Sequence, residues 1–571
     1  MVGAHQAFDD GIGEHVPQGR LDSRFPPGLL HRIGLPAARM NLCAGTGNPT
    51  FGIGSPEARL RKRRSEGDHV MMRKFVPAAL AFALLAAPAF AATDDQKKFA
   101  FDIVERNAEP MAQIGDSIFY FAELGMQEVE STKFMKETLE AAGFSVELGG
   151  AGMPTNLWAK WGSGRPHIVI VSEIDALPGG SQKPMEFERH PLVPGAPGHM
   201  EGHNTHGGLT AGAAFAVKEA MQRFNIPGTV SISLGPAEEQ LISRPYVVRA
   251  GYFKDVDAII YVHIGDGMAT GYGLANYASI SADFAFHGKT AHGAVNPWDG
   301  KDALDAVELM DMGAAFLRQQ LHPTYRLHRV ITNGGIQPNV IPDLAAAWWW
   351  VRDANMPDAK VTFDKLVNIA KGAALMTDTT MDFQVKAAGW PQLGNKVLAE
   401  DIQKNIDTVG MPKWREDEQK FARDFQKSAG QKEVGLKTAV TPLGGRLQSY
   451  ASNDSGDISW VVPAGLLSFP ASVPGIQYHE WHASITPTST IAHKGMVVGA
   501  KVLAGSILDL MTTPELLRKA HAEFDQVTKE SPYFPVLPAD AKPPLDLNKD
   551  QMARFRTAMS QFYLNLSPRL K

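Results

Sequence analysis

Three short runs of strand length in the first half of the chain constrain its fold more than any other feature. They span residues 166–172, 228–234 and 257–262. The first is a continuous apolar run, which is typical of a strand that a sheet buries on both faces. A helix pattern with small residues on one side, over 208–224, lies between the first two runs. The sequence therefore predicts a mixed α/β domain.

Polar side chains follow directly on all three runs. Asp175 comes after the first run, Glu238 and Glu239 come after the second, and His263 comes after the third. In an open α/β sheet the ligand crevice lies outside the carboxyl ends of the strands. We therefore expect these four side chains to point toward one place.

A fifth segment, 198–206, supplies a carboxylate and three imidazoles just before the helix pattern. The residues are His199, Glu201, His203 and His206. Carboxylate oxygens and imidazole nitrogens are ligands that Zn²⁺, Mn²⁺ or Co²⁺ accept from a site without thiolate. Taken alone, the segment is equally compatible with surface or helix-capping histidines.

The adjacent carboxylates Glu238 and Glu239 add an independent constraint. Consecutive side chains diverge, so one carboxylate can bind a metal while its neighbour reaches a metal-activated water. Metal-assisted hydrolysis needs this combination of a Lewis acid and a general base. A solvated acidic turn is the alternative interpretation of the pair in isolation.

The middle of the chain predicts a second, smaller unit. Strand patterns at 279–286 and 345–351 are separated by a helix pattern over 301–320. This arrangement suits an α+β module inserted into the main domain. Amphipathic helices return from about 392, and a long helix is predicted around 493–511. We place the catalytic domain at 92–278 and 392–517, the inserted module at 279–391, and a C-terminal extension at 518–571.

Residues 72–91 have the form of a secretory signal peptide. Basic residues precede an apolar run over 75–90, and small residues precede a cut after Ala91. The apolar run is short for a bilayer span, which leaves a membrane anchor as the alternative. We expect a periplasmic or secreted enzyme, with no window of membrane-span length after residue 91.

The residues before this segment, 1–71, form a doubtful leader, and Met71 or Met72 is the expected start. The only cysteine, Cys43, lies in the leader. The mature chain is therefore expected to have no disulfide and no catalytic thiol. A formal net charge of −5 gives no electrostatic footprint for nucleic acid, which is excluded as an expected partner.

The motifs occur together in an order that resembles the metal-dependent amidohydrolases, aminoacylases and carboxypeptidases of the cocatalytic-zinc peptidase type. The most similar branch is that of the p-aminobenzoyl-glutamate hydrolase large subunits. The resemblance implies a zinc-peptidase-like catalytic domain with a mixed central sheet, interrupted by a ferredoxin-like dimerisation or lid domain. It rests on the segments 173–178, 201–204, 235–239, 286–292, 338–342, 456–460 and 491–495, together with His263 and His479.

The resemblance implies a site for two divalent metal ions, Zn²⁺ or else Mn²⁺ or Co²⁺. Glu201 would bridge the ions, and Glu238 would be the general base. His482 is a rival of His479, because both lie in one segment. His203 and Glu239 would complete the shell of one ion, and His263 and His479 would complete the shells on the other side.

Further roles follow from the same resemblance. His292 would reach across a homodimer interface to stabilise the developing oxyanion in the partner's site. Asn339 and Arg352 would hold a substrate carboxylate, a task suited to the planar guanidinium. Asn204 and His206 would orient ligands or cap the following helix, and Asp175 would hold a ligand imidazole rather than a metal.

One position departs from the family pattern. The most similar relatives place Cys where this chain has Glu201. A carboxylate can bridge two ions through its two oxygens, so we interpret the change as a retuned metal site. A decayed site is the alternative.

The implied reaction is hydrolysis of the amide bond of an N-acyl or N-aroyl amino acid or a dipeptide, by a hydroxide that bridges the metals. Two other functions stay open: a catalytically silent dimeric protein that binds a small amide, and an amidohydrolase acting on a ureido or cyclic amide. Glu238 beside a full ligand set argues against the silent binder, because binding needs no general base.

Overall fold

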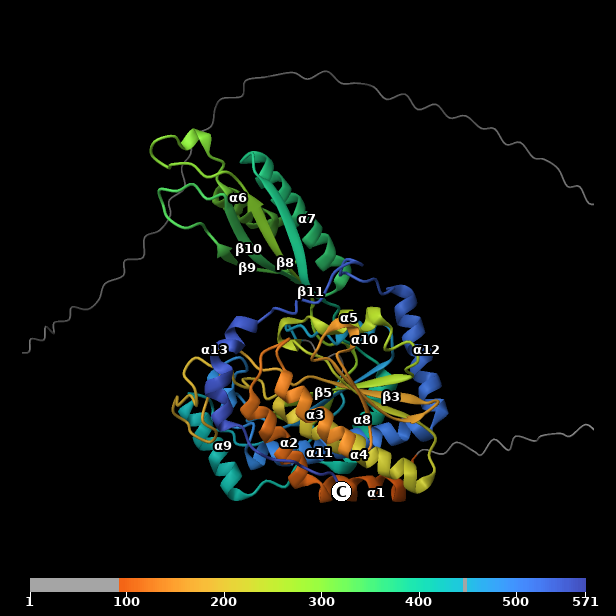
Figure 1. Ribbon diagram of the computed structural model, residues 1–571. Coiled ribbons are helices and arrows are strands. Elements are labelled where there is room, and N and C mark those ends of the chain that lie inside the picture. The colour runs from red at the N-terminus through yellow and green to blue at the C-terminus, as the bar shows by residue number, and fades with distance from the viewer. Residues whose placement is uncertain (1–91, 445–448) are drawn as a thin grey trace, which may run out of the picture. The chain divides into compact units, whose positions relative to one another are not determined.

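The three predicted strands lie next to one another in the larger of two sheets (Figure 1). In the computed structural model, which describes residues 92–444 and 449–571, they are β3 (His167–Ser172), β4 (Gly228–Leu234) and β5 (Ala258–Gly265). β3 pairs in parallel with both β4 and β5, so the carboxyl ends of all three meet at one edge. The predicted leader and signal peptide lie outside the described residues.

Antiparallel strands flank this parallel centre and make the sheet mixed, which confirms the predicted fold class. The strand order is β1-β2-β4-β3-β5-β13-β12-β7, and β6 pairs with β13. β13 runs parallel to β5, whereas β2 runs antiparallel to β4. The further strands are β1 (Ser145–Leu148), β2 (Leu157–Ser163), β6 (Ala269–Thr270), β7 (Gly273–Leu274), β12 (Leu393–Gly394) and β13 (Ala464–Pro470).

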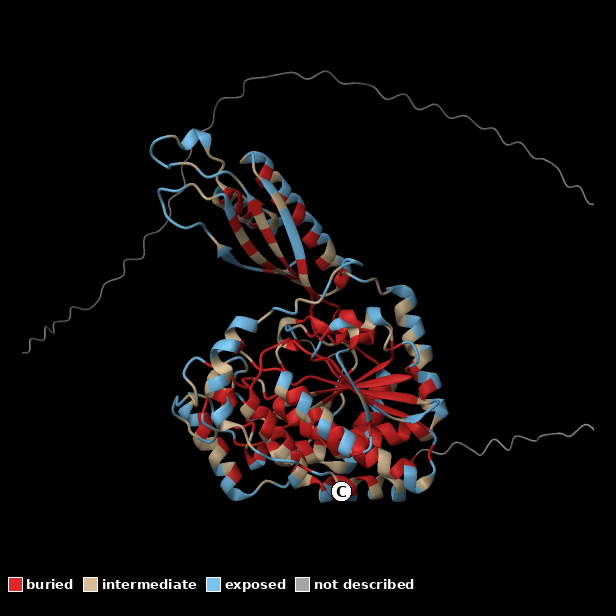
Figure 2. Cartoon of the chain, in the orientation of Figure 1, coloured by how far each residue is buried: buried red, intermediate tan, exposed pale blue. Residues whose placement is uncertain are grey.

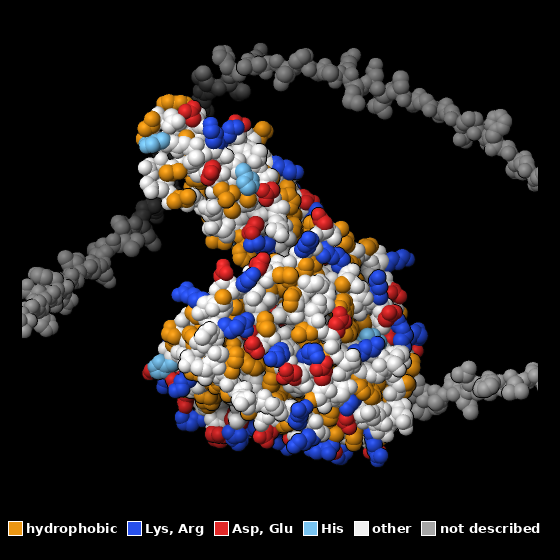
Figure 3. All heavy atoms as spheres, in the orientation of Figure 1, with side chains coloured by type: hydrophobic (Ala, Val, Ile, Leu, Met, Phe, Trp, Pro, Cys, Tyr) orange, Lys and Arg blue, Asp and Glu red, His pale blue; other side chains and the backbone are white. Residues whose placement is uncertain are grey.

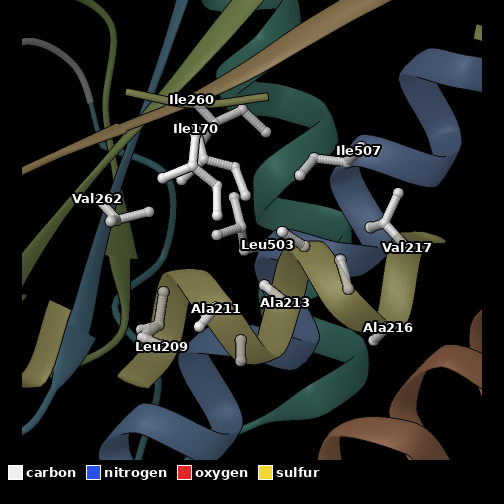
Figure 4. Close-up of a cluster of buried hydrophobic side chains, with 14 of the residues drawn as sticks. Ile170, Leu209, Ala211, Ala213, Ala216, Val217, Ile260, Val262, Leu503 and Ile507 are labelled. Atoms are coloured by element: carbon white, nitrogen blue, oxygen red, sulfur yellow. The ribbon is translucent and has the colours of Figure 1, made fainter. Parts of the chain in front are cut away.

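Two long helices, α4 (Asn204–Phe224) and α11 (Thr490–Thr512), form the core with this sheet. Figure 4 shows Ile170 and Ile260 from the strands facing side chains of α4 and Leu503 of α11. All three side chains are buried, and Figure 2 shows that buried residues concentrate in this region. Burial of one such side chain stabilises the fold by about 1.5–3 kcal/mol.

Helix α2 (Ala108–Phe121) approaches α4 closely because α4 carries glycines on that side. A Cβ atom on Gly208 would lie 2.2 Å from the Met111 carbonyl oxygen, and one on Gly212 would lie 2.3 Å from the Met111 sulfur. Either substitution would push the two helices apart. The other helices around the larger sheet are α1 (Asp94–Arg106), α3 (Val129–Ala141), α5 (Ser243–Ala250), α8 (Lys396–Val409), α9 (Glu416–Ser428) and α10 (Gly456–Ser459).

Helix α11 corrects one expectation from the sequence. Its most apolar window has a mean hydropathy of 1.4, so it is long and apolar enough to cross a bilayer. The prediction that no window after residue 91 approaches a membrane span is therefore wrong by length and composition. However, 78% of that window is buried inside the fold, because α11 packs against α1, α4 and β13. The apolar character of α11 is that of a core helix.

The smaller sheet has four antiparallel strands in the order β11-β8-β10-β9. Helices α6 (Ala303–Leu317) and α7 (Met356–Met376) pack on it, which gives the α+β character that the fold prediction required. The strands are β8 (Ala278–His287), β9 (Arg326–Asn333), β10 (Leu344–Asp353) and β11 (Thr380–Gly389).

Three consecutive tryptophans in β10 alternate between the two faces of this sheet. Trp349 is buried, with 2% of its surface exposed. Trp348 and Trp350 lie on the other face, with their ring centroids 6.3 Å apart. The alternation expected of a strand therefore directs Trp350 toward the same side as Arg352.

The C-terminal residues return to the N-terminal helices. After α12 (Pro514–Glu530) and an irregular segment, α13 (Lys549–Met559) places Arg556 in an ion pair with the buried Glu123. The Lys571 N–H donates to Asn107 Oδ1 at 2.7 Å, and Asn107 Nδ2 donates to the Lys571 carbonyl oxygen at 2.8 Å. These contacts tie the last residues to the loops before α2 and α3.

Candidate active site

A cavity of about 480 Å³ lies where the parallel strands end. Acidic and imidazole side chains line one part of it, and Tyr261, Leu241 and Leu466 contribute to its wall. The four side chains predicted to converge from the strand ends do so: Glu238, Glu239 and His263 line the cavity, and Asp175 lies behind them. The candidate ligands that line the cavity are Glu201, Glu239, His263 and His479.

Glu201 lies between the two histidines that the sequence assigned to one side of the metal site. Its Oε2 lies 2.7 Å from His479 Nε2, and its Oε1 lies 3.3 Å from His263 Nε2. His479 Nε2 also lies 3.3 Å from Glu239 Oε2. Ligand atoms of Glu201, Glu239 and His479 all lie within 4.8 Å of one another, which is close enough to share an ion.

His203 completes the cluster from the start of α4. It is buried, and neither ring nitrogen has a hydrogen-bond partner in the described part of the chain. Its Nδ1 lies 3.4 Å from Asp175 Oδ1 and 3.8 Å from Glu239 Oε1. Asp175 Oδ2 in turn accepts the Glu239 N–H at 3.0 Å. Asp175 therefore fixes the positions of two candidate ligands at once.

A local backbone conformation turns both glutamates into the cavity. Ala237 adopts a left-handed conformation, with φ of 55°, immediately before Glu238. Glu128 Oε1 accepts the Ala237 N–H at 2.8 Å and so holds this residue. A left-handed alanine costs about 1 kcal/mol or more and persists only where its surroundings impose it.

Glu173 is a close neighbour of the cluster that the ligand prediction did not include. One of its carboxylate oxygens lies within 4.8 Å of ligand atoms of His203 and His263. That carboxylate is already engaged, since it accepts from Arg244 Nη2 at 2.9 Å and from the Tyr261 hydroxyl at 2.8 Å. Burial opposes ionisation, but His206 and Arg244 lower the pKa of Glu173 to about 2. We interpret Glu173 as a support for the cluster.

The charges of the cluster favour a divalent cation. Burial and the nearby Glu201 carboxylate raise the pKa of Glu239 well above its usual range. Burial acts against the charged form of Glu201 too, but His263 and His479 hold its pKa well below the usual range. Several carboxylates crowd together around His203, whose ring nitrogens have no hydrogen-bond partner among the described residues, and a divalent cation would relieve both conditions. The nitrogen and oxygen donors present fit Zn²⁺, Mn²⁺ or Co²⁺.

Glu238 lies beside the candidate ligands, and Asn453 contacts it from the side away from them. Its Oε1 accepts from Asn453 Nδ2 at 2.5 Å, while its Oε2 lies 3.9 Å from His203 Nε2. Burial and the Glu173 carboxylate raise the pKa of Glu238 well above its usual range. A buried carboxyl with one oxygen directed toward a metal site is suited to accept a proton there.

Comparison with known proteins decides the family. The model of peptidase family M20/M25/M40 matches residues 169–509. The chain belongs to this family. It is therefore a metal-binding hydrolase that cleaves amide bonds, as the sequence predicted.

Two curated relatives illustrate the match. One is a subunit of the p-aminobenzoyl-glutamate hydrolase of Escherichia coli, which is 32% identical over 473 residues that cover 78% of this chain and 98% of that protein. The other is the Xaa-Arg dipeptidase of Mus musculus, which is 28% identical over 75% of this chain and 92% of that protein.

Solved structures support the fold. An aminohydrolase from methicillin-resistant Staphylococcus aureus matches with a TM-score of 0.54 and 18% identity, over 73% of this chain and 100% of that chain. The aminobenzoyl-glutamate utilization protein of Klebsiella pneumoniae matches with a TM-score of 0.53 and 17% identity, over 71% and 97%.

Arg352 enters the cavity of this M20 hydrolase from β10. Its Nη1 donates to Ser452 Oγ at 3.0 Å, and its guanidinium lies 4.7 Å from the Trp350 ring centroid. Burial lowers the pKa of Arg352, and among the described residues no carboxylate opposes that shift. A partly buried guanidinium without a protein anion is suited to bind an anionic group of a ligand.

His292 and Asn339 do not join the cavity of their own chain. Both are exposed, and the Gly293 N–H donates to the Asn339 carbonyl oxygen at 2.9 Å, so the two loops lie side by side. Neither residue lines the cavity. In the described part of the structure, neither residue can therefore contact a substrate in the cavity of its own chain.

Asn204 and His206, predicted to orient ligands or cap the following helix, form hydrogen bonds with backbone groups. His206 Nε2 accepts the Ile264 N–H at 3.0 Å and so fixes the strand end that carries His263. Asn204 Nδ2 donates to the carbonyl oxygens of Gly115 and Pro487, at 3.1 and 3.2 Å. Asn204 therefore joins α2, the start of α4 and the segment that follows His479.

His482, the rival of His479, lies apart from the cluster. Its Nδ1 contacts Glu480, and its ring stacks on Trp481 with a centroid distance of 3.7 Å. It does not line the cavity, whereas His479 does.

Four further residues that shape the site were not predicted from the sequence: Tyr261, Asn453, Arg244 and Asp454. Tyr261 lies two positions before His263 on β5, so strand alternation alone places both on one side. Buried Arg244 lies between Glu173 and Asp454. Asn453 and Asp454 come shortly before the recognised segment 456–460, which was the available signal.

Proposed function

We propose that this protein hydrolyses the amide bond between an acyl or aroyl group and an amino acid with a free carboxylate, with p-aminobenzoyl-glutamate as the substrate type. One observation carries the proposal: a single cavity is lined by four of the candidate metal ligands, by Glu238, and by Arg352, whose guanidinium has no carboxylate partner among the described residues. An amide held between these groups would have its carboxylate at Arg352 and its carbonyl at the metal ligands.

We propose two divalent ions, Zn²⁺, Mn²⁺ or Co²⁺, with Glu201 as the residue able to contact both. Its Oε2 lies in one group of candidate ligands with Glu239 and His479, whereas its Oε1 faces His263 of the other group, which supports contact with two ions. When bound, such ions polarise a carbonyl and lower the pKa of water. The residues of the chain supply the rest of the chemistry.

Glu238 is the proposed proton carrier. Its Oε2 accepts a proton from the attacking water and then delivers it to the amine nitrogen, which leaves as the C–N bond breaks. Arg352 orients the substrate through its carboxylate. The apolar wall formed by Leu241 and Leu466, with Trp350 nearby, suits an acyl group that includes an aromatic ring. The name of the Escherichia coli relative supports the same substrate type.

We further propose a homodimer in which His292 and Asn339 serve the partner's cavity. His292 Nδ1 accepts the Ala294 N–H at 3.1 Å, which leaves Nε2 to face outward. Nearby apolar side chains are exposed, including Trp298 at 78% and Ile336 at 96%. Exposed apolar surface of this kind is typical of protein–protein interfaces. Figure 3 shows hydrophobic side chains on the surface of the module formed by residues 279–391.

Mixed dimers test this contribution. His292→Ala and Glu238→Ala subunits are each expected to be inactive, whereas a heterodimer of the two has one complete site. Random reassociation should restore about a quarter of the wild-type sites. A mixture that stays inactive, with heterodimers shown to form, would rule out a contribution across the interface.

We also propose that the protein is exported, with residues 72–91 as a signal peptide cut after Ala91. The basic start, apolar run and small residues before the cut support it. N-terminal sequencing of protein purified from cells should begin at Ala92, and a chain that begins at Met1 would contradict the proposal.

Hydrolysis of a substrate panel tests the function directly. The panel contains p-aminobenzoyl-glutamate, its α-carboxamide, several N-acetyl amino acids, a dipeptide, and a ureido acid, each assayed before and after chelation. We expect cleavage of the carboxylate-bearing amides, loss of activity with the chelator, and recovery with added Zn²⁺, Mn²⁺ or Co²⁺. Preference for the ureido acid, or metal-loaded protein without hydrolysis, would refute the proposal.

A further inference from the structure

We propose that Asn453 is a positioning residue, which holds one carboxylate oxygen of Glu238 so that the other oxygen alone can carry the proton. This inference rests on the proposed function, in which Glu238 is the proton carrier. It concerns a residue outside the set of ligands and substrate anchors.

Asn453 lies in the cavity wall, 7% exposed, on the loop before α10. Its Nδ2 donates to Glu238 Oε1 at 2.5 Å and to the Tyr261 hydroxyl at 2.6 Å. A primary amide nitrogen has two hydrogens, so both are used in these two contacts.

The orientation of the amide follows from its other side. Asn453 Oδ1 accepts the Ser455 backbone N–H at 2.9 Å, and the Ser455 hydroxyl donates to the same oxygen. A backbone N–H can only donate, so the group facing it must be the amide oxygen. The nitrogen therefore faces Glu238, and a flipped amide would place its N–H group against the Ser455 N–H and its oxygen against the Glu238 carboxylate.

Tyr261 fixes the second hydrogen of the amide. The Tyr261 hydroxyl donates to Glu173 Oε1 at 2.8 Å, so it presents a lone pair to Asn453. Glu173 is itself held by Arg244 Nη2 at 2.9 Å. The contacts run without a break from Arg244, buried in the fold, to the carboxylate of Glu238.

This network makes the two oxygens of Glu238 unequal. Protonation of Oε1 would weaken its contact with Asn453, because the hydroxyl oxygen of a carboxylic acid is a poorer acceptor than its carbonyl oxygen, and Nδ2 could not accept the new proton. Oε2 lies 3.9 Å from His203 Nε2, on the side of the candidate metal ligands. The proton removed from water is therefore carried on Oε2 and passes from there to the leaving nitrogen.

The test compares Asn453→Leu, which matches the asparagine in shape but has no donor, with Tyr450→Phe as a control on the same loop. Tyr450 is 62% exposed and does not line the cavity. For p-aminobenzoyl-glutamate, Asn453→Leu should lower kcat about tenfold to hundredfold, a fraction of what a general base contributes. KM and metal content should stay within about twofold of the wild type, and Tyr450→Phe should match the wild type throughout.

A double variant separates positioning from a structural role. In the Glu238→Ala background, Asn453→Leu should cost no further activity, because Asn453 acts through Glu238. An additive loss, a rise in KM with kcat unchanged, or a loss of bound metal would each overturn the proposal.

A crystal structure of Asn453→Leu gives a second measurement that needs no activity. The Glu238 carboxylate should leave its wild-type position, and a carboxylate that stays in place would overturn the proposal. If the wild type fails to hydrolyse the whole substrate panel, the proposed function fails, and this comparison still decides the role of Asn453.

Discussion

His479 Nε2 lies 2.7 Å from Glu201 Oε2, although the two residues are 278 positions apart in the chain. The contact depends on a strained loop, because His479 has a left-handed backbone, with φ of 61°. The His479 N–H donates at 3.1 Å to the carbonyl oxygen of Met200, the neighbour of Glu201. Non-glycine residues in this conformation cluster at functional sites.

His479→Ala should therefore lower the metal content from about two ions per subunit to about one, as expected when one ligand of a two-metal site is removed. His482→Ala is the matched control, since it lies in the same segment and should keep both ions. Metal analysis by mass spectrometry after dialysis measures the difference. Loss of metal from the His482 variant alone would reverse the two assignments.

Metal removal should destabilise the fold. The site crowds buried carboxylates, and a bound cation stabilises the native state by about 3–4 kcal/mol when its concentration is 100 to 1,000 times its Kd. For a chain of this size, chelation should lower the Tm by about several degrees. Scanning calorimetry with and without chelator measures the shift. The Tm of a Glu201→Ala, Glu239→Ala double variant should not respond to chelator, and an equal shift in it would contradict the assignment.

Glu238→Gln should keep its metal and lose about 10²–10⁴-fold in kcat, the usual contribution of a general base. The amide keeps the shape of the side chain but cannot accept the proton. Metal content and stopped-flow turnover on one protein sample measure both effects together. Turnover within twofold of the wild type would remove Glu238 from the reaction.

Arg352→Lys should raise KM for p-aminobenzoyl-glutamate by about tenfold to hundredfold, the range expected for a lost charged hydrogen bond. The α-carboxamide of the same substrate should show no such change. Arg326 faces Arg352 across the β9–β10 pair but does not line the cavity, so Arg326→Lys is the matched control. Equal effects on the acid and the amide would contradict carboxylate binding.

Asp457 should make stability depend on pH. Burial raises the pKa of Asp457 to about 7, against the opposing hydrogen bonds from the Trp390 N–H and Tyr533. Between the unfolded pKa of about 4 and this value, the folded state binds the extra proton. The protonation of Asp457 thus contributes to the free energy of unfolding in full below about pH 4, and this contribution is lost as the pH rises to about 7.

Asp457→Asn resembles the protonated form and should flatten this part of the profile. The wild type should lose up to about 1.4 kcal/mol of unfolding free energy per pH unit relative to the variant. Urea unfolding at several pH values from 4 to 8 measures the difference. Parallel profiles for the two proteins would show that Asp457 does not titrate in this range.

The parallel strands and the polar residues after them could be predicted because burial on both faces leaves an apolar run in the sequence. The strands of the smaller sheet gave weaker signals for physical reasons. Most of β9 is exposed, so its side chains have no alternation to detect. An irregularity between Val385 and Ala387 breaks the alternation of β11.

The candidate ligands could be assigned from their residue types together with the family resemblance, whereas the role of Asn453 could not. The role of Asn453 depends on the orientation of its side-chain amide. A hydrogen bond from the Ser455 N–H fixes that orientation, and it forms only in the folded loop. His292 lies in an exposed loop, and its function would need a second chain. Sequence order identifies such residues but does not determine what they face.

The ion pair between Arg556 and Glu123 gives the last part of the chain a role in the timing of assembly. Asn548, next to α13, donates at 3.0 Å to the carbonyl oxygen of Gly125, and a Cβ on Gly125 would lie 2.7 Å from the Cα of Ala237. The ribosome synthesises α13 after the turn at Ala237, so the nascent chain lacks this ion pair until α13 joins the fold. The backbone turn before Glu238 is therefore braced by a segment that comes much later in the chain.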